Sequence, residues 1–126
     1  MEIDLPHQVI GACMEVHRIL GPGLARDVYE TCLAVELRQM EMRYERARPL
    51  TFLYRDTEVK TETKLDFIVE DELLIVVKAV DELSEQDKAD MEALMRLSHL
   101  RSGLLVNFRV PVLRKGIHRV VLKRRE

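Results

Sequence analysis

The residues 64–78, KLDFIVEDELLIVVK, predict two β-strands joined by an acidic turn, and these strands form the centre of the expected fold. Leu65, Phe67 and Val69 recur at every second position, which is the spacing of a half-buried strand. The second strand, residues 73–77, is an unbroken apolar run rich in β-branched side chains, as expected of a central strand covered on both faces. Asp66 and Lys78 stand out as ionisable residues among these apolar positions and therefore mark a candidate site.

The composition is that of an ordinary globular protein, and we expect a single domain over residues 1–126. Apolar residues make up 47% and charged residues 33%, and a net charge of −2 gives no general argument for nucleic-acid binding. The end of the chain is nevertheless basic. Arg114, Lys115, Arg119 and Lys123 are candidate nucleic-acid-binding residues, with a solvated edge that deters strand pairing as the alternative.

The two cysteines give no sign of a metal or redox site. Cys13 and Cys32 do not form a CxxC motif, and no histidine lies at zinc-ligand spacing, so we expect buried reduced thiols and a cytoplasmic location. The first residues lack the basic and apolar segments of a signal peptide. No apolar run approaches the ~20 residues needed to span a bilayer, and a membrane is therefore not among the expected partners.

A βαβ unit follows from the order of the patterns. Ser84 is a good N-cap with Asp87 three residues later, which predicts a capping box and a helix directly after the central strand. Because the next apolar run is again a strand, the two strands should be parallel with a right-handed crossover. The expected elements are a helix from Asp4 or Pro6 to Gly21-Pro22-Gly23, a helix over 24–40, strands over 42–46, 49–54, 59–69 and 73–80, a helix over 84–99, and strands over 104–108 and 117–122.

The residues 11–23, GACMEVHRILGPG, followed by Tyr29, resemble the opening signature of the GxxExxY proteins. These are small bacterial and archaeal domains of the PD-(D/E)XK nuclease-like superfamily. The similarity continues through Leu65-Asp66, through residues 77–80 and through the strand GLLVNF at 103–108, so it covers about residues 9–122. It implies a restriction-endonuclease-like α/β core of order αβββαβ, with a mixed sheet, a central βαβ crossover and flanking helices.

The resemblance also implies a metal site, which this sequence only partly retains. In the superfamily, carboxylates from a helix and two strands hold Mg²⁺, the metal activates a water, and a lysine steadies the developing charge. Asp66 and Lys78 are retained, but Arg26 and Val76 stand at the positions of the other two acids. Asp66 is therefore the one metal ligand expected if a metal binds at all, and it could instead pair with Arg26 or Lys78 in a relict site.

Three functions are consistent with these residues. The favoured one is a catalytically inactive member of the family that acts in nucleic-acid association or protein interaction and needs no cofactor. The second is an active nuclease, dependent on Mg²⁺ or Mn²⁺, in which carboxylates such as Asp27 or Asp90 replace the missing ligands. Asp27 is a poor replacement, because its side chain should point about 100° away from that of Arg26 around the helix. The third is a structural homodimer, or a module for an unidentified protein partner, that uses the old cleft or an edge strand.

His17 allows two interpretations as well. It could act as a catalytic base, but on an apolar helix face beside a Gly-Pro-Gly turn we interpret it as a core histidine bonded to a backbone carbonyl.

Overall fold

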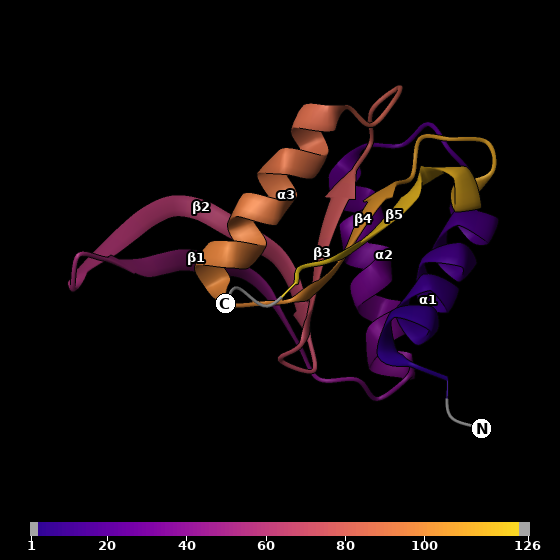
Figure 1. The fold of residues 1–126 in the computed structure, drawn as a ribbon. Coiled ribbons are helices and arrows are strands. Elements are labelled where there is room, and N and C mark those ends of the chain that lie inside the picture. The colour runs from indigo at the N-terminus through magenta and orange to yellow at the C-terminus, as the bar shows by residue number, and fades with distance from the viewer. Residues whose placement is uncertain (1–2, 124–126) are drawn as a thin grey trace.

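The computed structural model describes residues 3–123 and places five strands in one mixed sheet (Figure 1). The strand order is β1-β2-β3-β4-β5; β3 and β4 are parallel, and the other neighbours are antiparallel. The predicted βαβ unit and mixed sheet are thereby confirmed. The elements are α1 (Leu5–Leu20), α2 (Arg26–Gln39), β1 (Tyr44–Tyr54), β2 (Thr57–Val69), β3 (Leu73–Lys78), α3 (Glu85–Ser98), β4 (Ser102–Asn107), the 3₁₀ helix η1 (Leu113–Gly116) and β5 (Ile117–Val121).

Helices cover both faces of the sheet, with α1 and α2 on one face and α3 on the other (Figure 1). Strand β3 divides its side chains between the two resulting cores. Ile75 and Val77 pack in the core under α1 and α2, whereas Leu74 and Val76 pack against the core under α3. This two-sided burial explains why the strand is apolar at every position from 73 to 77.

The region 42–54 differs from the prediction, because β1 is one long strand and not two short ones. Ala47 has a positive φ of 53°, and the pairing register with β2 shifts between Pro49 and Thr51. Strand β2 pairs with β1 on both sides of this irregularity, so the break that the sequence suggests becomes a local distortion within a continuous ladder. The resulting hairpin extends away from the rest of the sheet (Figure 1).

The helix ends follow the expected chemistry, with one exception at α2. Asp4 caps α1 by accepting a hydrogen bond of 3.0 Å from the His7 backbone N–H, and the predicted capping box of Ser84 opens α3. At the start of α2, Ala25 occupies the N-cap position and gives no side-chain hydrogen bond. The first N–H groups of α2 are therefore left without a capping side chain.

Cys13 is fully buried, and burial raises the pKa of its thiol to about 12; Cys32 is half-buried, and both are free. Within residues 3–123, no helix has the length and apolar character needed to cross a membrane.

Candidate functional site

Asp66 lies where β2 and β3 separate. The last registered pair between these strands is Phe67 with Ile75, one residue further along β2. Beyond that pair, the Oδ2 atom of Asp66 accepts a hydrogen bond of 2.9 Å from the Val77 backbone N–H. The half-buried carboxylate thus takes the place of a backbone carbonyl in the ladder, and one of its oxygens is bonded to the protein itself.

Lys78 turns toward α3 and not toward Asp66. Its Nζ atom lies 3.8 Å from Oδ1 of Asp87, the acid of the capping box. The backbone N–H of Ser84, which donates to the Asp87 carboxylate, lowers the pKa of Asp87, and the nearby Lys78 lowers it further. The expected pairing of Asp66 with Lys78 or Arg26 is wrong, because no ion pair of 4.0 Å or less includes Asp66 among residues 3–123.

Val76 and Arg26 replace the expected acids in two different ways. The half-buried Val76 packs against the core beneath α3, so a hydrocarbon contact stands where a metal ligand was implied. Arg26 is the first residue of α2 and is exposed. It faces a cleft that it shares with two other cations.

This relict cleft, as we call it, has a volume of about 470 Å³. Its three charged lining residues, Arg26, Lys78 and Arg109, are all basic and come from the start of α2, the end of β3 and the segment after β4. Arg109 lies 3.7 Å from Asp81, but both side chains are largely exposed and the pair is therefore weak. The remaining lining residues are Gly23, Leu24, Ala25, Ala79 and Val80.

Two buried side chains fix the walls of the relict cleft. The Nδ2 atom of Asn107 donates to the Val80 carbonyl at 2.8 Å, and its Oδ1 accepts from the Val80 N–H at 3.0 Å. Tyr29 stacks on Phe108 with ring centroids 4.7 Å apart. Its hydroxyl donates to the carbonyl of Gly21 at 2.6 Å and accepts from the N–H of Leu24 at 3.2 Å. Both walls are therefore held by satisfied buried hydrogen bonds.

Glu30 is a residue of this site that the sequence reasoning missed. It is half-buried, and its pKa is raised, first by burial and then by the negative charge of Asp66, while Arg26 and Arg46 act in the opposite direction. Glu30 follows Arg26 by four residues and so lies on the same face of α2, one turn later. That spacing was the available signal, whereas only Asp27 and Asp90 were named from the sequence as replacement acids.

These residues do not fit the three-carboxylate Mg²⁺ site that the resemblance implies. Among residues 3–123, no three His, Cys, Asp or Glu side chains are grouped so that they could hold a metal ion. The acid considered on α3, Asp90, accepts a hydrogen bond of 2.6 Å from Gln86. Mg²⁺ depends on carboxylates and water for its ligands, and the donor set present here is too small for it.

The candidate nucleic-acid-binding residues are spread over η1, β5 and the segment after β5. Arg114 and Lys115 lie in η1, whereas Arg119 lies in β5 and pairs with Asp4 at 3.1 Å. Lys123 lines a pocket at the end of α3.

His17 has the structural role interpreted from the sequence. Its Nε2 atom donates to the carbonyl of Val110 at 2.7 Å, which ties α1 to the segment before η1.

Comparison with known proteins identifies the family. No curated protein and no solved structure matches the chain. The family described as the PD-(D/E)XK nuclease superfamily matches residues 3–120, which includes every described strand and helix except the last residue of β5. A mixed five-stranded sheet with helices on both faces is consistent with the core of that superfamily. The chain therefore belongs to the PD-(D/E)XK nuclease superfamily.

Proposed function

We propose that this protein is a member of the GxxExxY group with a degenerate metal site, and that it associates with nucleic acid through the relict cleft without cleaving it. The observation that supports this function most directly is the position of Arg26. A cation stands where a metal-binding carboxylate is expected, and it lines one cleft together with Lys78 and Arg109. A fixed positive charge thus takes the place of the metal's charge.

The cleft has the chemistry of a phosphate site. An arginine guanidinium can donate two parallel hydrogen bonds to phosphate oxygens. Lys78 adds a weaker contribution, because the Asp87 carboxylate lies 3.8 Å from its ammonium. The uncapped N-terminus of α2 adds backbone N–H groups and the positive end of the helix dipole at the same place. Among residues 3–123, no carboxylate pairs with Arg26 within 4.0 Å, so its guanidinium is available to a ligand.

Binding without metal tests the proposal. A fluorescein-labelled single-stranded DNA of 20 nucleotides is titrated with protein in EDTA, and its anisotropy is recorded at several salt concentrations. We expect Arg26→Glu to weaken binding about tenfold or more, and the salt dependence to become less steep, because a phosphate contact is lost. Arg38→Glu is the matched control, since Arg38 is exposed in the last turn of the same helix. Equal losses in both variants would overturn the proposal.

The absence of cleavage is tested separately. Single- and double-stranded DNA are incubated with the protein and Mg²⁺ or Mn²⁺, and we expect no cleavage above that of an Asp66→Ala control. An Asp66→Asn variant is included because it preserves a hydrogen-bond acceptor for Val77. Reproducible cleavage that both substitutions abolish would show that the site is active.

A metal-dependent nuclease with rearranged ligands is the second candidate. The observation that favours this second function concerns Glu30, a half-buried acid whose pKa is raised in part by the negative charge of Asp66. The expected sign of such a nuclease is Mn²⁺-dependent cleavage that is lost in Glu30→Gln as well as in Asp66→Asn. Cleavage that Glu30→Gln leaves unchanged would remove this candidate.

A further inference from the structure

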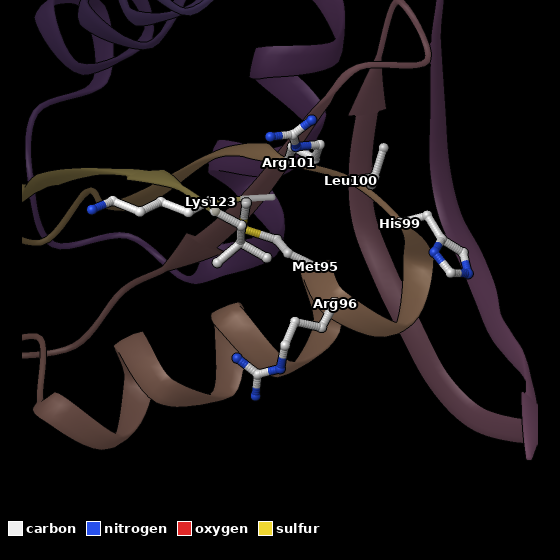
Figure 2. Close-up of a pocket in the computed structure, with 7 residues that line it drawn as sticks. Met95, Arg96, His99, Leu100, Arg101 and Lys123 are labelled. Carbon is white, nitrogen blue, oxygen red and sulfur yellow. The ribbon is translucent and has the colours of Figure 1, made fainter. Parts of the chain in front are cut away.

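A second pocket lies at the opposite end of β4 from the relict cleft. Arg101, directly before β4, lines this pocket, whereas Arg109, shortly after β4, lines the relict cleft. The pocket has a volume of about 620 Å³ and is formed by the end of α3, the segment that leads into β4 and the residues after β5 (Figure 2). We call it the α3 pocket; its lining residues are Met95, Arg96, His99, Leu100, Arg101, Leu122 and Lys123.

The floor of the α3 pocket is apolar. Met95 is fully buried, Leu100 is 7% exposed and Leu122 is half-buried, and all three belong to or pack against the core beneath α3. The floor is therefore continuous with the hydrophobic core, and its shape is fixed by packing. It offers a ligand an aliphatic surface in a hollow large enough for one big side chain.

The rim of the α3 pocket is basic. Arg96, Arg101 and Lys123 are exposed, and His99 joins them, held by a left-handed backbone with φ of 62° that ends α3. No acidic residue is among the described lining residues, and no ion pair within 4.0 Å includes any of the three permanent cations among residues 3–123. Like charges gathered without a counter-charge favour the binding of an anionic partner.

The arrangement fits a peptide better than a nucleic-acid strand. Figure 2 shows the charged ends of Arg96, Arg101 and Lys123 at separate points around the apolar floor, pointing in different directions. A nucleic-acid groove instead sets its cations along the path of the backbone and offers aromatic rings on which bases stack. The α3 pocket has no Phe, Tyr or Trp among its described lining residues.

We propose that the α3 pocket docks an acidic peptide segment of a protein partner, with one large apolar side chain on the floor and flanking carboxylates on the rim. Desolvation of the apolar side chain supplies most of the affinity, and the arginines select acidic neighbours by paired hydrogen bonds. This docking site is independent of the proposed function, since the two sites share no residue.

A peptide library tests the proposal. Displayed dodecapeptides that hold one Leu, Phe or Trp between Asp and Glu residues are selected on the full chain, and the best sequence is synthesised with a fluorescein label. We expect its binding to weaken tenfold or more in Arg96→Glu/Arg101→Glu, and about as much when its apolar residue is changed to Ser. Leu122→Gln should also weaken it without changing any charge.

Matched controls separate the α3 pocket from general electrostatics. Arg114→Glu/Lys115→Glu makes the same change in net charge at exposed residues outside the pocket, and should alter the affinity less than twofold. Arg26→Glu should leave peptide binding intact, so failure of one site is distinguishable from failure of the other. Selection of no acidic apolar peptide would overturn the proposal. Equal losses of peptide affinity in both double variants would also overturn it. The same holds if Arg96 and Arg101 bind a labelled oligothymidylate but do not bind the peptide.

Discussion

The carboxylate of Asp66 is hydrogen-bonded to the backbone N–H of Val77 at 2.9 Å, so this acid links two strands of the sheet. This contact gives Asp66 a structural role that does not depend on metal. It also explains how a carboxylate is accommodated between two largely apolar strands.

Substitution of Asp66 should therefore affect stability. Asp66→Ala leaves the half-buried site without an acceptor for the Val77 N–H, and we expect it to lower the free energy of unfolding by about 1–3 kcal/mol. Asp66→Asn keeps an acceptor oxygen and should cost less. Urea unfolding followed by circular dichroism measures both changes. Equal stability of Asp66→Ala and the unmodified protein would contradict a structural role.

Restoring the missing acids should restore a metal site. We expect Arg26→Glu/Val76→Glu to bind Mn²⁺, because it places two carboxylates at the positions that the resemblance to the GxxExxY proteins assigns to metal ligands beside Asp66. Millimolar Mn²⁺ should then raise the Tm of the double variant by several degrees, through selective binding to the folded state, and leave that of the unmodified protein unchanged. Each single variant is the control, and a Tm that does not respond to Mn²⁺ in the double variant would show that the positions are misassigned.

Glu30 should make stability depend on pH in a predictable direction. Its pKa is raised in the folded state, so the unfolded chain gives up the proton first, and stability falls as the pH rises through the unfolded pKa toward the folded one. Glu30→Gln removes this penalty. We expect the variant to match the unmodified protein at pH 4 and to be the more stable of the two at pH 7, as measured by urea unfolding at both values.

The same experiment in an Asp66→Asn background identifies the source of the shift. Loss of the Asp66 charge should lower the pKa of Glu30, so the stabilisation that Glu30→Gln gives at pH 7 should become smaller. If Glu30→Gln stabilises the Asp66→Asn protein at pH 7 as much as it stabilises the unmodified protein, burial alone raises the pKa of Glu30.

Tyr29 should control the mobility of the loop before α2. Tyr29→Phe keeps the stacking on Phe108 but removes the two hydrogen bonds to Gly21 and Leu24. We expect a loss of about 1–2 kcal/mol in stability and faster amide hydrogen exchange at Leu24 than in the unmodified protein. Unchanged exchange at Leu24, with the amides of α1 as the reference, would show that the hydroxyl does not hold this wall of the relict cleft.

The central part of the fold could be predicted because its signals are local. The apolar run of β3 and the cap formed by Ser84 and Asp87 are both visible within a few residues, and they fix the βαβ unit. The continuity of β1 could not be predicted. Ala47 and Pro49 look like a break, and only the pairing with β2 on both sides shows that the strand continues through it.

The candidate site was predictable only where a motif fixes the spacing. Arg26 and Val76 were assigned from their neighbours' resemblance to the GxxExxY signature, and that assignment stays a prediction. Arg109 and Glu30 required the fold, since the first reaches the cleft from the segment after β4 and the second, on α2, has its pKa raised by the charge of Asp66 on β2. The expected Asp66–Lys78 pair failed because β3 alternates its side chains and turns Lys78 toward α3.

Val76 has a consequence beyond the metal ligand that the resemblance implies at this position. In a working site of this type, several carboxylates are held close together, and their mutual repulsion strains the folded chain until a divalent cation neutralises it. At Val76 this protein has a hydrocarbon that packs against the core beneath α3, so that repulsion is absent from the centre of the sheet. We therefore expect the thermal stability of the domain to be indifferent to chelators, since the valine makes this position of the central strand part of the hydrophobic packing beneath α3.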